Sequence, residues 1–129
     1  MNIDLVGVGT DIIEIARVQK AAANKQNSRF INRVFTENEI SFCTARRNPW
    51  PSFAARFSAK EAVFKALGTG LTNWQEVEIL NGGDKPPVVV LSGTAEQIAR
   101  SLGIGKILVS VSHDKERAVA FAVAVGKEI

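Results

Sequence analysis

The sequence predicts an α+β fold, in which an antiparallel sheet of hairpins packs against one long central helix and shorter helices. An alanine-rich stretch over residues 53–67 has no internal proline, and Gly68 follows where a helix would end. Two pairs of β-rich runs, within residues 77–91 and 106–125, are each joined by a short polar turn, as in hairpins. No linker, repeat or low-complexity tract divides the 129 residues, so we expect a single domain over residues 1–129.

The chain opens with an expected strand over residues 3–13, which is apolar but interrupted by Gly7 and Gly9. Glycines inside a strand indicate a bulge or a close approach of another backbone. Asp11 stands at the end of this run. It could cap the helix expected over residues 13–24, which aspartate commonly does, or it could carry a function.

A capping box marks the next helix: Thr36 would cap it, Glu39 would bond back to the cap, and the helix would continue to about Arg46. Cys43 within this helix is interpreted as a packed thiol, because no neighbour would make it reactive. A proline-containing break over residues 48–51 precedes the central helix. The remaining elements are strands over residues 77–80 and 88–91, a helix over residues 92–103, and strands over residues 106–112 and 118–125.

The composition excludes some classes of protein. A formal charge of +3 and a pI near 9.3 permit an acidic partner, such as a phosphorylated ligand, an acidic protein or nucleic acid. One cysteine excludes an internal disulfide and a cysteine-rich metal site, and it suits a reducing compartment. With no signal-peptide pattern and no apolar run long enough for a bilayer, we expect a cytoplasmic protein without a membrane partner.

Three charged residues of the central helix lie close to its apolar stripe. In a 3.6-residue helix, Glu61 falls beside the stripe, Lys65 lies one turn beyond it on the same flank, and Lys60 points further into the apolar side than a phosphate ligand should. A buried charge costs free energy unless a charged partner meets it. The alternatives are long side chains that reach out to solvent, or a functional site. The stripe consists of Phe53, Phe57, Phe64 and Leu67.

Asp11 and Glu61 are the candidates for chemistry, together with Lys60, Lys65 and the single histidine, His113. Two carboxylates, with water and phosphate oxygens, are ligands that Mg²⁺ prefers, and a nearby lysine would stabilise charge on a transferring phosphoryl group. The alternative for His113 is a structural residue at the end of a strand. The sequence contains no zinc-ligand cluster, Walker loop, nucleophile elbow or complete dinucleotide fingerprint.

Two motifs of the chain resemble those of the holo-acyl-carrier-protein synthases, the small bacterial 4′-phosphopantetheinyl transferases. Residues 8–12 resemble the first motif, and residues 57–62 are similar to the second and more specific one. The resemblance covers essentially the whole chain, in order. Ser58 stands where the family more often carries alanine, and residues 86–87 depart from its usual hairpin. The other matching residues are Glu14, Arg17, 35–36, Glu39, Lys65, 68–70, 91–93 and 109–113.

The resemblance implies an enzyme of fatty acid biosynthesis that moves the 4′-phosphopantetheine arm of coenzyme A onto a serine of an acidic apo-acyl carrier protein and releases adenosine 3′,5′-bisphosphate. Asp11 and Glu61 would bind Mg²⁺, or Mn²⁺ in its place, on the coenzyme A pyrophosphate. Glu61, or a water that it orients, would accept the serine proton. Lys65 would neutralise the phosphates, and Lys60 would hold the departing or attacking oxygen.

The resemblance also implies which residues bind the substrates. Arg17 and Lys20 would form part of the helix that docks the acidic carrier protein, although such a run of cations is commonly only a solvated face. The family forms homotrimers with active sites between subunits, so Arg56 and His113 would complete a neighbour's site. Coenzyme A would be bound by Arg56, Lys65, Gly68, Thr69, Gly70 and His113.

Two functions of other classes compete with the transferase. A small basic nucleic-acid-binding domain would suit the charge and the aromatic residues. The aromatic residues fall mostly at core spacings and no nucleic-acid motif is found, so we expect no nucleic-acid partner. A trimeric interaction module without activity would use the same basic helix. Modification of an apo carrier protein would distinguish the transferase from both.

Overall fold

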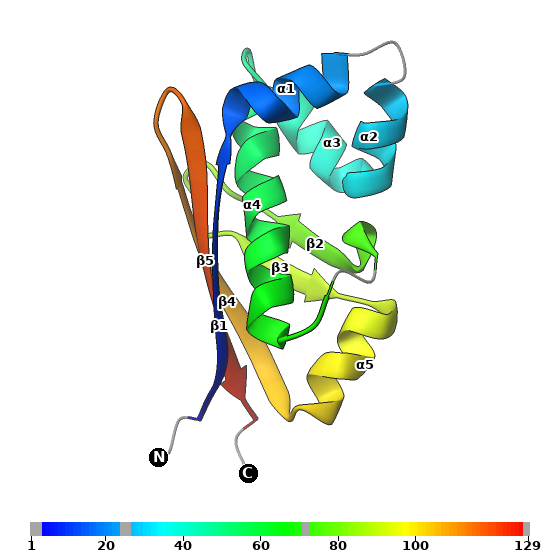
Figure 1. The fold of residues 1–129 in the computed structure, drawn as a ribbon, viewed down its shortest axis with the longest axis vertical. Coiled ribbons are helices and arrows are strands. Elements are labelled where there is room, and N and C mark those ends of the chain that lie inside the picture. Colours follow the sequence, from blue (N-terminus) through cyan, green and yellow to red (C-terminus); the bar gives the residue numbers. More distant parts are fainter. Residues whose placement is uncertain (1–3, 24–26, 71–72, 128–129) are drawn as a thin grey trace.

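A computed structural model describes residues 4–23, 27–70 and 73–127, and Figure 1 shows it as a ribbon. The order of its helices and strands confirms the predicted α+β class. In chain order the elements are β1 (Leu5–Glu14), α1 (Ile15–Ala23), α2 (Asn27–Val34), α3 (Glu37–Thr44), α4 (Trp50–Leu67), the 3₁₀ helix η1 (Trp74–Glu76), β2 (Val77–Leu80), β3 (Val88–Leu91), α5 (Gly93–Ser101), β4 (Ile104–His113) and β5 (Arg117–Gly126).

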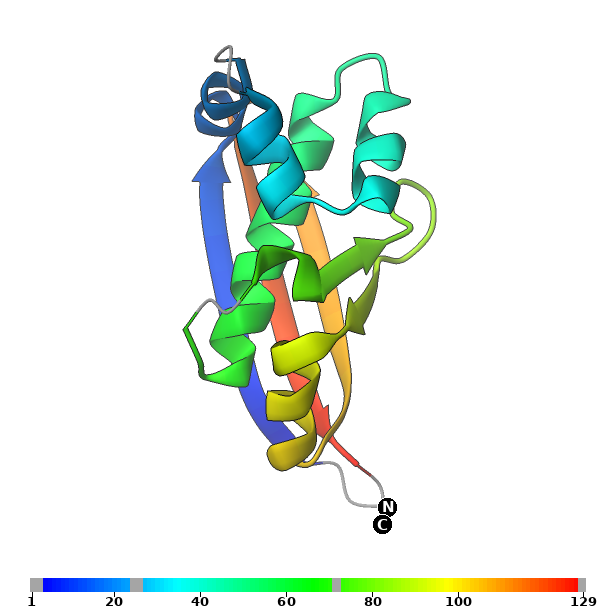
Figure 2. The same cartoon turned by 90° about the vertical axis from the view of Figure 1, so that its right-hand side faces the viewer.

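Both predicted hairpins are present. β4 and β5 form an antiparallel hairpin, and β1 pairs with the other side of β5, so β5 is the central strand of a three-stranded sheet. β2 and β3 form a separate two-stranded sheet. Figures 1 and 2 show α4 lying along one face of the larger sheet, with α1, α2 and α3 gathered at one end. No helix in the described ranges is long and apolar enough to cross a membrane.

The helix α4 is buried on two sides, whereas the predicted stripe accounted for only one. Phe53, Phe64 and Leu67 are at most 3% exposed, as predicted, and Phe57 is partly buried. The opposite side of α4 is lined with small residues and faces the sheet. These small residues let the helix approach the strands closely, since alanine adds little bulk. The buried alanines of β5 below α4 are Ala118, Ala120, Ala122 and Ala124.

Gly7 and Gly9 mark the closest approach of the backbones of β1 and α4. A Cβ atom added to Gly7 would overlap the carbonyl oxygen of Ala66, and one added to Gly9 would overlap that of Ala62. The pairing of β1 with β5 also shifts register between Leu5 and Gly7. The predicted close approach is therefore confirmed, and a bulge accompanies it.

Local signals correctly placed the start of α3 and the end of α4, whereas α1 begins at Ile15, two residues later than expected, and α4 begins at Trp50, inside the expected break. Thr36 and Glu39 form the predicted capping box at the start of α3. Gly68 ends α4 in the left-handed conformation, with φ of 70°. That conformation costs glycine little, because it has no Cβ. Pro49 and Pro51 lie at the start of α4, where a missing backbone N–H is tolerated.

The short helix α2 was not predicted, because residues 25–33 read as a run of cations. Its apolar residues are few but well placed. Phe30 stacks on Phe57, with ring centroids 6.2 Å apart, and meets Phe35 edge-on at 6.3 Å. Contacts with distant parts of the chain therefore stabilise a helix whose own sequence signal is weak.

Candidate active site

The close contact between β1 and α4 brings Lys65 to the strand that carries Asp11. Lys65 Nζ donates a hydrogen bond to the carbonyl oxygen of Thr10 at 2.9 Å and lies 3.5 Å from Asp11 Oδ1. The Asp11 side chain is 17% exposed, whereas that of Lys65 is 54% exposed. Asp11 lies inside β1, opposite Ala120, and β1 continues to Glu14. The alternative that Asp11 caps the following helix is therefore wrong.

Glu61 lies one helical turn before Lys65 and shares this environment. Burial raises the pKa of Glu61, the negative charge of Asp11 raises it further, and Lys65 acts in the opposite direction. Two carboxylates that repel each other suit a hard divalent ion with oxygen ligands. Within the described residues no three His, Cys, Asp or Glu side chains form a metal cluster. The Asp11–Glu61 pair therefore fits a divalent ion whose other ligands are water and substrate oxygens.

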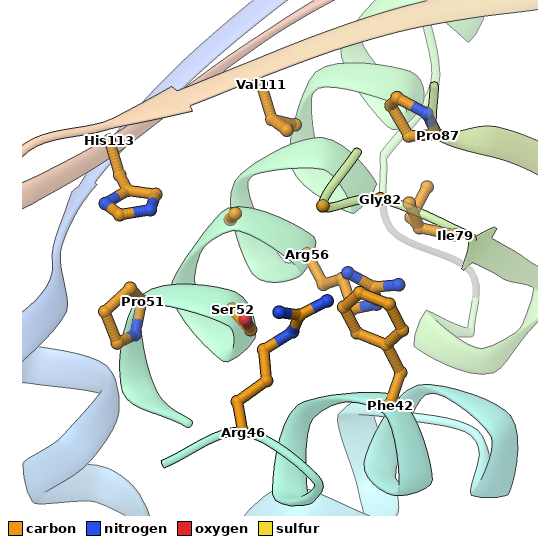
Figure 3. Close-up of a pocket in the computed structure, with 12 residues that line it drawn as sticks. Phe42, Arg46, Pro51, Ser52, Arg56, Ile79, Gly82, Pro87, Val111 and His113 are labelled. Carbon is orange, nitrogen blue, oxygen red and sulfur yellow. The ribbon is translucent and has the colours of Figure 1, made fainter. Parts of the chain in front are cut away.

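A second cluster lines a pocket of about 160 Å³ on the other flank of α4 (Figure 3). Its walls come from the end of α3, the first half of α4, the turn between β2 and β3, and the end of β4. The lining includes Phe42, Arg46, Arg56, Ile79, Gly82, Val111 and His113.

Two arginines of this pocket share one aromatic ring. The guanidinium carbons of Arg46 and Arg56 lie 4.1 and 4.0 Å from the centre of the Phe42 ring. Arg56 is only 6% exposed, and burial lowers its pKa. Its Nη2 donates a hydrogen bond to the carbonyl oxygen of Asn81, but its Nε has no partner.

These arginines are short of negative charge. In the described part of the chain, neither Arg46 nor Arg56 has a carboxylate within ion-pair distance. Two neighbouring guanidinium groups without a carboxylate are suited to an anion with several oxygen acceptors. A phosphate group meets that requirement.

His113 reaches the same pocket from β4, as Figure 3 shows. It is exposed at the last position of β4, opposite Ala118, and its Nδ1 lies 3.2 Å from the carbonyl oxygen of Asp114. The structure thus brings together the predicted pair Arg56 and His113. Sequence reasoning missed Arg46 and Phe42, although their spacing of four residues at the end of a helix places both on one face.

The two clusters lie on opposite flanks of α4. Asp11 on β1 and Val111 on β4 both pair with Ala120 on the central strand, so about 10 Å separates the two edges. On α4, Arg56 and Glu61 are five positions apart, which turns their directions by about 140°. The chain therefore does not bring Arg56 and His113 to the Asp11–Glu61 pair. The predicted residues Gly68, Thr69 and Gly70 follow the end of α4, beyond Lys65.

Lys60 belongs to neither cluster. Its side chain is completely buried and forms an ion pair with Glu39 at 2.8 Å. Lys60 Nζ also donates hydrogen bonds to the carbonyl oxygens of Trp74 at 3.1 Å and Val77 at 2.7 Å. All three N–H groups of the ammonium are used, so none remains for a phosphate. This placement contradicts the predicted catalytic role of Lys60, and it equally contradicts the alternative that Lys60 extends to solvent.

The predicted docking residues lie on exposed surface. Arg17 and Lys20 are exposed on α1, and Arg29 and Arg33 are exposed on the neighbouring α2. Lys25, which completes the run of cations, lies outside the described residues.

Comparisons with known proteins agree on one family. The family model described as the 4′-phosphopantetheinyl transferase superfamily matches residues 7–122. A holo-[acyl-carrier-protein] synthase of Desulforudis audaxviator is 46% identical over 124 residues, which cover 95% of this chain and 94% of that protein.

Two solved structures have the same fold. The crystal structure of the holo-ACP-synthase of Plasmodium yoelii superposes with a TM-score of 0.85 at 30% identity, over 99% of this chain and 100% of that one. A holo-(acyl-carrier-protein) synthase of Bacillus anthracis in complex with CoA (3′,5′-ADP) superposes with a TM-score of 0.76 at 31% identity, over 95% of this chain and 98% of that one.

Proposed function

The chain belongs to the 4′-phosphopantetheinyl transferase superfamily, and from this premise we propose that it transfers the 4′-phosphopantetheine arm of coenzyme A to a serine of apo-acyl carrier protein and releases adenosine 3′,5′-bisphosphate. The observation that carries this proposal is the meeting of Asp11, Glu61 and Lys65 where α4 contacts β1. A substrate pyrophosphate and a hard divalent ion would both find complementary groups there. In this proposal residues 1–129 form one domain, which acts in the cytoplasm in fatty acid biosynthesis.

In the proposed reaction the serine oxygen attacks the phosphorus that carries pantetheine, and the bond from that phosphorus to the bisphosphate oxygen breaks. Glu61, or a water that it orients, accepts the serine proton. The ammonium of Lys65 neutralises charge that develops on the phosphoryl oxygens. Asp11 and Glu61 would hold Mg²⁺, or Mn²⁺, which when bound would supply further positive charge to the pyrophosphate.

The pocket on the other flank of α4 would bind the adenosine end of coenzyme A. Arg46 and Arg56 offer several N–H donors of their guanidinium groups to its 3′-phosphate. His113 would contact the same end of the ligand from β4. Residues 68–70 would contribute backbone groups to the ligand next to Lys65.

A second subunit would unite the two clusters. α4 separates the first cluster, Asp11 and Glu61, from the second cluster, which includes Arg56 and His113. One coenzyme A molecule would therefore bind between the first cluster of one subunit and the second cluster of its neighbour. An exposed apolar face supports self-association as the proposed homotrimer. On this face of the sheet, turned away from α4, the residues from 38% to 62% exposed are Val8, Ile12, Leu108, Val119 and Phe121.

Mixing two inactive variants tests this arrangement. Glu61→Gln removes a group of the first cluster, and Arg56→Ala removes one of the second. In a ring of shared sites, a statistical 1:1 mixture of subunits should recover about a quarter of the sites, because each site needs one intact half from each neighbour. If co-expressed mixtures recover no activity although light scattering verifies their assembly, both clusters act within the same subunit.

The transfer itself is tested by intact mass. The protein is incubated with coenzyme A, Mg²⁺ and an apo-acyl carrier protein, and the carrier should gain one phosphopantetheine. Glu61→Gln should abolish the metal-dependent gain while the protein remains folded. A carrier that stays unmodified, under conditions in which a known transferase modifies it, would refute the proposal.

A further inference from the structure

We propose that the buried ion pair of Glu39 and Lys60 positions the pocket that contains Arg46 and Arg56. The pair holds β2 in place, so that the turn after β2 closes over Arg56. Neither Glu39 nor Lys60 lines the pocket. The inference rests on the proposed function in one respect, namely that the pocket binds the 3′-phosphate of coenzyme A.

The pair occupies the free edge of β2. Lys60 donates to the carbonyl oxygen of Val77, and Glu39 Oε2 accepts a hydrogen bond from the N–H of Ile79 at 2.7 Å. In a strand, the N–H and C=O groups of residues two apart point to the same edge, and β3 pairs along the other one. The two side chains therefore supply the donor and the acceptor that a third strand would have supplied.

Every polar group of the pair is used. Glu39 Oε1 accepts from Lys60 and also from the N–H of Thr36 at 2.9 Å, which is the capping box of α3. Both charged side chains are 0% exposed. A pair this deeply buried holds its geometry tightly, because any displacement leaves a charge or a backbone group without a partner.

The turn that follows β2 carries this placement to the pocket. The carbonyl oxygen of Asn81, directly after β2, accepts the hydrogen bond from Arg56 Nη2. A Cβ atom on Gly82 would lie 3.4 Å from Phe42 Cζ and 3.5 Å from Arg56 Nη1, so the turn backbone lies directly on the ring and the guanidinium. Asn81 has φ of 62° and Gly82 has φ of 115°, conformations that fix a sharp turn.

The pair and the pocket are built on the same three elements. On α3, Glu39 precedes Phe42 by three residues, and on α4, Arg56 precedes Lys60 by four, so each residue of the pair neighbours a pocket residue on its own helix. On β2, the bonded residue Ile79 precedes Asn81 by two. A shift of β2 would move the Asn81 carbonyl away from Arg56 and release the guanidinium.

Calorimetric binding of two nucleotides to the full-length protein tests the inference. Adenosine 3′,5′-bisphosphate carries the phosphate assigned to the pocket, and adenosine 5′-monophosphate lacks it. In the double variant Glu39→Gln/Lys60→Met, which avoids a lone buried charge, the preference of the protein for the bisphosphate should fall about tenfold. If the double variant only lost overall stability, the ratio of the two affinities, measured well below its Tm, would stay unchanged.

The variant Ile104→Ala is the matched control. Ile104 is 6% exposed at the start of β4 and does not line the pocket, so its truncation destabilises the core without removing either hydrogen bond from the pair to β2. It should retain the wild-type preference. An unchanged preference in the double variant would overturn the positioning role while leaving the proposed function intact. A wild-type protein that binds neither nucleotide would overturn both.

If the double variant does not fold, amide hydrogen exchange in the wild type decides the question. Adenosine 3′,5′-bisphosphate should slow exchange at the N–H of Thr36, which donates to Glu39 of the pair and does not line the pocket. Unchanged exchange at Thr36, under conditions in which the nucleotide is bound, would overturn the inference.

Discussion

Replacing Gly9 with alanine tests the contact on which the candidate active site depends. A methyl group at this position would overlap the carbonyl oxygen of Ala62 and would lie 2.8 Å from Ala66 N and 2.9 Å from Lys65 Cβ. Because carbon contacts relax at ~3.5–4.0 Å and the overlap with the Ala62 carbonyl oxygen is the most severe, β1 would have to move away from α4 by more than ~1 Å.

The cost follows from the rigidity of the obstructing atoms. Overpacking costs ~1–3 kcal/mol, and the upper end applies where the obstacle is helix backbone. Alanine recovers ~0.5–1 kcal/mol because it loses less chain entropy than glycine on folding, which leaves a net loss of about 2 kcal/mol. With an unfolding entropy of ~2.1 cal/mol/K per residue over 129 residues, Tm should fall by about 7 °C.

The same displacement should impair transfer. Moving β1 separates Asp11 from Glu61 and stretches the hydrogen bond from Lys65 to Thr10, now 2.9 Å long. Misplacement of catalytic groups on this scale costs about 100-fold in kcat/KM. Thermal unfolding followed by circular dichroism and the rate of carrier modification measure the two effects.

Gly70→Ala is the control for stability. Among the described residues, no atom lies within 4 Å of a Cβ added to Gly70, so Tm should stay within about 2 °C of the wild type. If Gly9→Ala matches the wild type in both Tm and transfer rate, the backbone contact of β1 with α4 does not determine the site, and the reasoning is refuted.

Three further outcomes are expected. Arg17→Glu should raise KM for an acidic carrier protein with little change in kcat, and the rise in KM should be smaller at high salt. An unchanged KM would contradict the docking role of Arg17. The backbone N–H groups of Arg117 and Glu116 donate to Asp114 and lower the pKa of its carboxyl group below the ordinary 3.8. Asp114→Ala should therefore lower Tm at neutral pH, and the difference in Tm between variant and wild type should vanish as the pH falls through the pKa of the folded state. A difference in Tm that does not depend on pH would contradict this prediction. Burial raises the pKa of the Cys43 thiol to about 12, so this thiol should resist alkylation near pH 8 in the native protein. Alkylation as fast as in the unfolded protein would refute this prediction.

The elements that could be predicted are those with local signals. The Thr36 capping box and the left-handed Gly68 each depend on atoms a few residues apart, and both were found where predicted. The two hairpins depend on short turns and were also correct. Helix α2 was missed because its stability comes from Phe30 packing on Phe57, which lies 27 positions further along the chain.

Among the site residues, Lys60 shows where such reasoning ends. Helical periodicity correctly directed Lys60 into the apolar side of α4. It could not supply the partner, because Glu39 lies 21 positions earlier in the chain and is noticed there only as a helix cap. Arg46 and Phe42 were missed for a related reason, since their role depends on the distant Arg56.

By itself the sequence determined the α+β class, most element boundaries and the family, because periodicity, caps and ordered motifs are properties of neighbouring residues. It also singled out Gly7 and Gly9 as points of close approach. Only the tertiary structure decided that α4 separates Asp11 and Glu61 from Arg56 and His113, and that Lys60 is a core residue. The physical reason is that periodicity gives the direction of a side chain from its own helix or strand axis, whereas a site depends on distances between elements, which packing alone sets.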